Sequence, residues 1–145
     1  RADVESMLEA AMLAPSACDR RAWEFVVVRS QAVKEQIMAL HPYTQMLKTA
    51  PLAVVVCGRP DLQDGIGEGF WPQDCAAVVE NMLLAAVELG YGGCWCGCYP
   101  KVERAEQLRA LLGATGTPVA VVALGVPDEA PKARGFFEPE KVRYL

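Results

Sequence analysis

Cysteines are the residues of this chain best suited to chemistry, and three of them alternate in the segment Cys94-Trp95-Cys96-Gly97-Cys98. The segment is typical of a strand, in which alternate side chains point to one face, so the three thiols are expected to share a side. Structural zinc sites need four ligands and usually take paired cysteines with two to four residues between them, whereas only one residue separates each pair here. No second cluster completes such a set, because His41 is the only histidine. We therefore favour small buried residues inside a sheet over the alternative of a thiolate metal site.

A second segment of chemical interest is Ala14-Pro15-Ser16-Ala17-Cys18-Asp19-Arg20-Arg21-Ala22-Trp23. A helical pattern stops at Pro15, small and polar residues follow, and a β-branched run begins after Trp23. Small residues between a helix and a buried strand leave room for a flat, polar ligand to approach the backbone. Gly90, Gly92 and Gly93, which precede the cysteine segment, permit the same close approach. The two segments together indicate a ligand site.

Three further residues are candidates by type. His41 precedes Pro42 at an expected helix end, where a capping or surface role is favoured over general-base chemistry. Lys132 and Arg134 lie on one side of an extended segment and could bind a phosphate, the alternative being a solvated face. The chain has no G-x-S-x-G or P-loop motif and no dinucleotide-binding G-x-G-x-x-G.

The hydrophobic pattern predicts the elements that position these residues. Apolar residues at helical spacing predict helices over residues 3–13, 32–40, 43–49, 71–89 and 101–112. Short continuous apolar runs predict buried strands over residues 25–28, 52–57, 94–98 and 119–124. Residues 61–69 are expected to form a flexible surface loop, and residues 125–145 a Pro-rich tail. This alternation predicts an α/β or α+β sheet flanked by helices.

Composition narrows the class of protein. The 145 residues are 52% hydrophobic and 22% charged, which suits one domain with a substantial core. A net charge of -4 argues against a nucleic-acid-binding protein. No apolar run reaches the roughly 20 residues of a membrane span, and no signal peptide is expected. The six cysteines lie in apolar segments, so we expect reduced thiols and a cytoplasmic protein.

Six segments, taken in order, resemble the nitroreductase family of flavoproteins over nearly the whole chain. They are EAAMLAPSA (9–17), WEFVVV (23–28), APLAVVVC (50–57), FWPQDCAA (70–77) with ENMLLAA (80–86), LGYGGCWCGCYP (89–100), and LGVP (124–127) with PKAR (131–134). The resemblance implies an α+β nitroreductase-like fold with a central, mostly antiparallel sheet flanked by helices. It also implies a homodimer with FMN at the subunit interface, much of which the 71–89 helix would form.

The implied activity is that of an FMN-dependent NAD(P)H oxidoreductase, with NAD(P)H as the electron donor. It would reduce nitroaromatic, quinone or similar planar acceptors by ping-pong hydride transfer. The alternative is a protein of the same fold that binds flavin or another planar ligand without redox turnover. The chemistry lies on the flavin, so no catalytic side chain is required.

The resemblance also implies the cofactor-binding residues. Pro15, Ser16 and Ala17 would approach the flavin, and Asp19 stands where the family usually has an Asn. The backbone of Trp95, Cys96 and Gly97 would lie along the N5 and O4 edge of the ring. The phosphate would be held by two cations, Lys132 and Arg134.

Two positions depart from the family pattern. Family members begin with an Arg-Arg-Ser-x-Arg element, whereas this chain starts at Arg1-Ala2-Asp3, so one domain over residues 1–145 without that element is expected. Asp19 cannot donate the hydrogen bond of an Asn amide, and it would repel a reduced, anionic flavin. The neighbouring Arg20 and Arg21 would compensate by pairing with Asp19 or with the phosphate.

Overall fold

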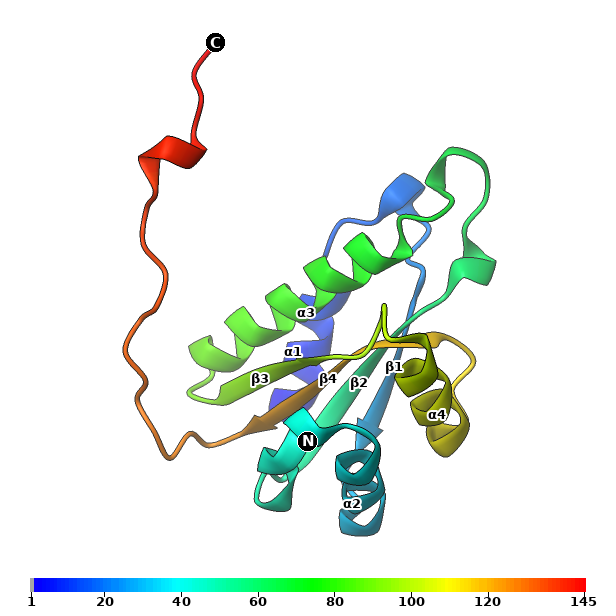
Figure 1. The fold of residues 1–145 in the computed structure, drawn as a ribbon, viewed down its shortest axis with the longest axis vertical. Coiled ribbons are helices and arrows are strands. Elements are labelled where there is room, and N and C mark those ends of the chain that lie inside the picture. Colours follow the sequence, from blue (N-terminus) through cyan, green and yellow to red (C-terminus); the bar gives the residue numbers. More distant parts are fainter. Residues whose placement is uncertain (1) are drawn as a thin grey trace.

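The computed structural model describes residues 2–145, so Arg1, and with it the start of the N-terminal segment discussed above, lies outside the described part. The helices and strands are α1 (Ala2–Met12), β1 (Trp23–Val28), α2 (Gln31–Leu40), β2 (Leu52–Gly58), α3 (Trp71–Glu88), β3 (Gly92–Gly97), α4 (Val102–Leu112) and β4 (Thr117–Gly125) (Figure 1). Short 3-10 turns occupy the connections at Ala17–Asp19, Pro42–Lys48, Pro60–Leu62, Gly65–Gly67 and Pro139–Lys141. The elements expected from the hydrophobic pattern are therefore present, and the short helical segment expected over residues 43–49 is the 3-10 helix Pro42–Lys48.

The four strands form one antiparallel sheet in the order β1-β2-β4-β3. One row of paired residues crosses it: Val26 lies opposite Val55, Val55 opposite Val121, and Val121 opposite Cys96. The central strands are the two long apolar runs, and the cysteine strand β3 is an edge. The expected α+β fold with an antiparallel sheet flanked by helices is confirmed.

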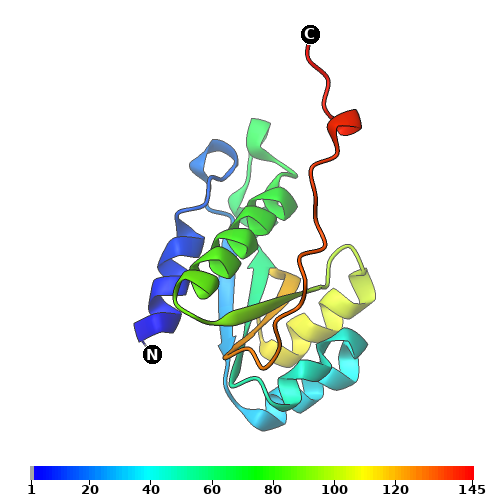
Figure 2. The ribbon, with the colours of Figure 1, turned by 90° about the vertical axis from the view of Figure 1, so that its left-hand side faces the viewer.

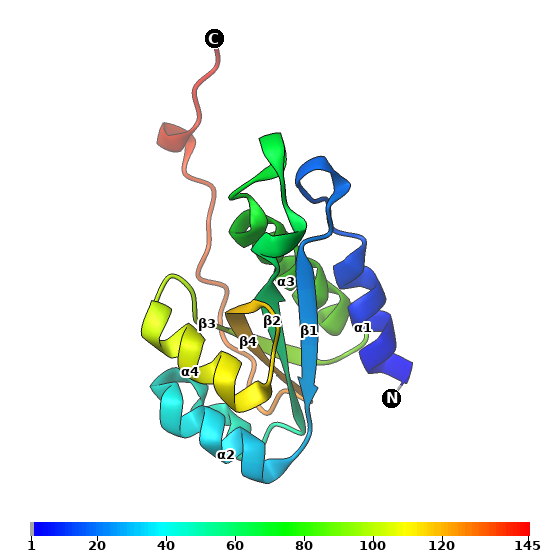
Figure 3. The ribbon, with the colours of Figure 1, turned by 90° about the vertical axis from the view of Figure 1, so that its right-hand side faces the viewer.

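Helices cover both faces of the sheet (Figures 2 and 3). Helices α1 and α3 pack against one face, where Val54, Val56 and Val122 point. Helices α2 and α4 cover the other, where Val55 and Val121 point. Because alternate residues of β2 supply two cores, every residue of that strand is buried, which explains its continuous apolar sequence.

The long helix α3 begins at a proline turn and ends at a glycine. Pro72 occupies the first turn, where its missing N–H costs no helical hydrogen bond, and Gly90 takes a left-handed φ of 83° just after the helix. One side of α3 packs on α1 and the sheet. The opposite side leaves Leu84 and Val87 exposed at 60% and 68%.

The chain beyond β4 runs away from the layered body (Figure 1). Residues 126–145 contain one short turn, Pro139–Lys141, and are exposed almost throughout. Phe136 and Phe137 are 79% and 74% exposed on this tail. The absence of helical or strand periodicity in its sequence predicted this extended course.

Candidate functional site

The loop after α1 holds its backbone in an unusual conformation. Cys18, Asp19 and Arg21 all take positive φ values, of 53°, 52° and 51°. Non-glycine residues in this region cost on the order of 1–3 kcal/mol each and persist where surrounding contacts fix them, typically at functional sites. Pro15 is exposed, and Ser16 and Ala17 are half-buried. The loop of residues 15–21 therefore presents small, accessible residues on a strained backbone.

A buried carboxylate, that of Asp74, is hydrogen-bonded to the backbone of this loop. Asp74, in the first turn of α3, accepts the backbone N–H of Ala17 at 3.0 Å and the side-chain amide of Gln63 at 3.0 Å. Gln63 in turn accepts the backbone N–H of Trp71 at 3.0 Å. Asp74 and Gln63 are 6% and 8% exposed. Neither residue was among the candidates expected from the sequence. An acidic residue among the apolar residues at the start of α3 could have indicated a buried, hydrogen-bonded carboxylate.

The charged side chains of the loop pair with acids. Arg20 forms an ion pair with Asp64, and Arg21 Nε lies 3.5 Å from Asp19 Oδ1. The backbone N–H of Arg21 also donates to Ser16 Oγ at 2.9 Å. The expected pairing of an arginine with Asp19 is thus present and involves Arg21.

The segment 61–69 is a surface loop, as expected, with short 3-10 turns and two buried residues. It contains one complete 3-10 turn and the end of another, and Gln63 and Gly67 are buried. Gly67 lies against the 15–21 loop, because a Cβ there would stand 3.4 Å from Cys18 Sγ. The other residues of the segment are exposed, so it is a surface loop that contacts the 15–21 loop through the buried Gly67.

Strand β3 offers exposed backbone at the sheet edge. Trp95 is 40% exposed and Gly97 is exposed, whereas Cys96 is 4% exposed. A Cβ at Gly97 would meet no atom within 4 Å, whereas one at Gly93 would lie 2.5 Å from Leu83 Cδ2. The region around Gly97 is therefore open to a ligand, and the glycine at position 93 serves close packing on α3.

His41 has the capping role expected of it at the end of α2, but it is buried at 1% exposure and not at the surface. Its backbone N–H caps α2 by donating to Ile37 O, and its Nε2 lies 2.9 Å from the carbonyl of Gly97. A carbonyl only accepts, so Nε2 is the protonated nitrogen, and Nδ1 is buried without a partner. Burial and the nearby Arg104 lower the pKa of His41.

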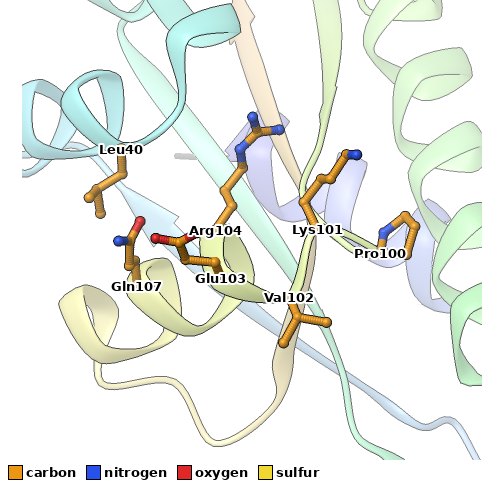
Figure 4. A pocket seen from close by; sticks show the side chains of 7 residues that line it. All are labelled: Leu40, Pro100, Lys101, Val102, Glu103, Arg104 and Gln107. Atoms are coloured by element: carbon orange, nitrogen blue, oxygen red, sulfur yellow. The ribbon is translucent and has the colours of Figure 1, made fainter.

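Arg104 approaches the same carbonyl from α4, its Nη1 lying 3.2 Å from Gly97 O. It also lines a surface hollow of about 450 Å³ between α2 and the start of α4, together with Lys101 and Glu103 (Figure 4). Two donors, His41 just after α2 and Arg104 in α4, thus fix the Gly97 carbonyl. No sequence motif predicted this arrangement.

Two of the three alternating cysteines, Cys96 in β3 and Cys98 just after it, are buried as expected, whereas Cys94 is exposed. Cys94 Sγ and Cys96 Sγ lie 3.9 Å apart, and Cys96 also contacts Tyr43 O at 3.2 Å. Burial raises the pKa of Cys96 and of Cys98 to about 12. Within residues 2–145, no three His, Cys, Asp or Glu side chains gather where they could hold a metal ion.

The tail carries Lys132 and Arg134 outside regular structure, and both are exposed. Across the described chain, no hydrogen bond or ion pair links these cations, the 15–21 loop and residues 95–97 to one another. The single chain thus displays the expected binding segments separately.

An apolar hollow lies on the outer side of α1 and α3. Its volume is about 620 Å³, and its walls include Leu13, Leu84 and Val87, with Asn81 and Glu88 at the polar margin. Leu13 is 79% exposed. None of the described helices combines the length and hydropathy needed to cross a bilayer.

Comparison with known proteins gives a consistent result. The nitroreductase family model matches residues 1–41 and 39–126. A protein of Methanothermobacter thermautotrophicus, provisionally named NADH dehydrogenase/NAD(P)H nitroreductase, is 42% identical over 141 residues, covering 96% of this chain and 73% of that protein.

Solved structures of proteins with related names share this fold over nearly the whole chain. One from Parabacteroides distasonis with the same provisional name has a TM-score of 0.92 and 29% identity, covering 99% of this chain and 84% of its own. An FMN-dependent nitroreductase from Clostridium difficile has a TM-score of 0.87 and 26% identity, covering 99% and 87%.

Proposed function

The chain belongs to the nitroreductase family, and we propose that it is an FMN-dependent NAD(P)H oxidoreductase acting on nitroaromatic, quinone or similar planar acceptors. The observation that carries this proposal is the match to relatives named for NAD(P)H nitroreductase activity over nearly the whole chain. The relative described as FMN-dependent, which shares the fold, supports the cofactor.

The residues present suit FMN in three respects. The 15–21 loop offers small residues on an accessible backbone, and Gly97 has open space where a side chain would stand. Among the described residues, neither Lys132 nor Arg134 has an ion-pair partner. We assign the cofactor to Pro15, Ser16, Ala17, Asp19, Trp95, Cys96, Gly97, Lys132 and Arg134.

We further propose a homodimer in which both chains contribute to each site. The binding segments are not joined within one protomer, and the hollow on α1 and α3 leaves Leu13, Leu84 and Val87 uncovered. A second copy packed on this face would bury these side chains, whose exposure is otherwise unfavourable.

Bound FMN would supply the redox chemistry, a ping-pong hydride transfer from NAD(P)H to the acceptor. The residues of the chain would bind the cofactor and orient it. Lys132 and Arg134 would provide charge-assisted hydrogen bonds to the phosphate, remote from the ring. His41 and Arg104 fix the Gly97 peptide, so the strand edge stays rigid where the ring would lie. The Asp19 carboxylate keeps Arg21 beside it.

We also propose that residues 1–145 act as one domain and that the protein works in the cytoplasm. All six cysteines are unpaired thiols, as a reducing compartment maintains.

The first test is reconstitution with FMN. The purified protein should show flavin absorption bands, and the variant Lys132→Ala/Arg134→Ala should bind FMN roughly a hundredfold more weakly, since two charge-assisted contacts are lost. Lys141→Ala/Arg143→Ala removes the same charge from the same tail, where Lys141 pairs with Glu138 at 2.7 Å, and should bind normally. Riboflavin, which has no phosphate, should not distinguish the variants.

The second test is turnover with NADH or NADPH and menadione or a nitroaromatic. Oxidation of a pyridine nucleotide that depends on the acceptor supports the enzyme. Bound flavin without such oxidation favours the planar-ligand-binding alternative. Protein that retains no chromophore after incubation with FMN contradicts the proposal.

A further inference from the structure

The buried network beneath the 15–21 loop has a role that goes beyond folding. We infer that Asp74 and Gln63 are positioning residues that hold this loop in the shape that receives the flavin; the inference rests on the proposed function. The contacts run from Trp71 N–H to Gln63, from the Gln63 amide to Asp74, and from Ala17 N–H to Asp74.

The two ends of this network are backbone N–H groups, and they fix the direction of every hydrogen bond in it. The backbone N–H groups of Trp71 and Ala17 are donors and cannot be otherwise. Gln63 must therefore turn its oxygen to Trp71 and its NH₂ to residue 74. Residue 74 then faces donors on both sides, which a carboxylate satisfies with its two oxygens and an amide cannot.

The loop needs this support because of its own backbone. Cys18, Asp19 and Arg21 hold positive φ values without glycine. A strained segment relaxes unless its surroundings determine it. The bond from Ala17 to Asp74 lies directly before the strained residues and fixes the start of the turn.

Further contacts place the other end of the loop on the same support. Arg20 pairs with Asp64, and Gly67 lies against Cys18. Both partners belong to the segment that follows Gln63. The segment 60–70 and the first turn of α3 thus form a seat for the loop, with Gln63 and Asp74 at its buried centre.

The location of Asp74 at the start of α3 favours the ionised carboxylate, whose two oxygens accept these hydrogen bonds. The first turn of an 18-residue helix carries partial positive charge from unpaired N–H groups, which favours a carboxylate. Burial at 6% exposure excludes water as a substitute partner, so loss of the carboxylate leaves a backbone N–H or a side-chain amide facing another donor.

The experiment is an exchange of the two side-chain types. In Asp74→Asn, one donor–donor contact remains whichever way Gln63 turns, and the dissociation constant of FMN should rise roughly tenfold. In the double variant Asp74→Asn/Gln63→Glu, the Asn amide donates to the Glu carboxylate, which also accepts Trp71 N–H. Every hydrogen bond and the net charge are restored, so affinity should return to within about twofold of the parent.

A matched control separates positioning from general stability. Glu24 is also a carboxylate that accepts two backbone N–H groups, those of Thr115 and Gly116 at 3.1 Å and 2.7 Å, in the α4–β4 turn. Both N–H groups donate to one oxygen, Oε2, which a Gln could replace, so the control is Glu24→Ala. This variant should lower the unfolding midpoint of the apoprotein without changing FMN affinity. The visible circular dichroism of bound FMN should change in Asp74→Asn and recover in the double variant.

The outcomes are distinct. Weakened binding in Asp74→Asn, with recovery of the affinity and of the circular dichroism of bound FMN in the exchange, supports the inference. Parent-like binding in Asp74→Asn, or a folded double variant that fails to recover, overturns it. A parent protein that binds no FMN instead overturns the proposed function.

Discussion

His41 gives the protein a titration that can be followed alone. It is the only histidine of the chain, and the only side chain whose ordinary pKa, near 6.5, lies between pH 5 and 7. We predict that stability falls as the pH drops through this range and that His41→Gln removes the fall. Gln is chosen because its side-chain amide can replace Nε2 as the donor to Gly97 O.

The sign follows from the lowered pKa of His41 in the folded state. Burial and Arg104 disfavour the imidazolium, and protonation would leave a second buried donor at Nδ1, which has no partner. Below pH 6.5 the unfolded chain takes up a proton that the folded protein does not. The free energy of unfolding therefore declines, by at most about 1.4 kcal/mol per pH unit, until the pH reaches the folded-state pKa. Above about pH 7.5 the histidine contributes no pH dependence.

The assay is urea unfolding followed by circular dichroism at pH 7.5, 6.5, 5.5 and 5.0. Subtracting the variant's stability from that of the parent at each pH cancels the carboxyl groups common to both. The difference should be largest at pH 7.5 and smaller at pH 5.5 and 5.0. A difference that stays constant down to pH 5.0, or that grows in favour of the parent, refutes the assignment. Arg104→Gln should reduce the total fall, because the folded-state pKa is then less depressed.

Three further predictions concern thiols, packing and the loop. Ellman's reagent should react quickly with two thiols in the native protein, Cys18 and Cys94, and with all six in urea, because burial raises the pKa of the others to about 12. Gly58→Ala should cost about 1–3 kcal/mol in urea unfolding, since its Cβ would lie 2.1 Å from the Trp71 ring; unchanged stability would contradict the packing, and Gly135→Ala, in open space, is the neutral control. Asp19→Asn should strengthen FMN binding by about 2- to 10-fold in fluorescence titration through the amide donor it gains, and weaker binding would count against the loop's assignment.

The sequence was sufficient for the architecture because its strongest signals are local. Residues 52–57 and 119–124 are continuous apolar runs, and only strands covered on both faces need such a pattern. The helix over residues 71–89 was predicted from apolar residues that cover much of its circumference. The order of these elements, with the segment around Pro15 and the glycines near residue 92, was enough to indicate the family.

Local patterns could not show which residues packing buries. His41 caps α2, as its place before a proline suggested, but its burial depends on the Gly97 carbonyl at the end of the edge strand β3. Segment 61–69 is a surface loop, as its glycines and acids suggested, but its sequence did not show that Gln63 and Gly67 are buried.

The sequence by itself determined which segments are helices and strands, that two strands are buried on both faces, and which segments resemble a flavin-binding family. Only the tertiary structure decided how the candidate site is supported, by Asp74 beneath Ala17 and by His41 behind Gly97. These pairs are 57 and 56 residues apart. Their side chains meet because the fold brings distant elements together, and no periodicity along the chain encodes a hydrogen bond of that span.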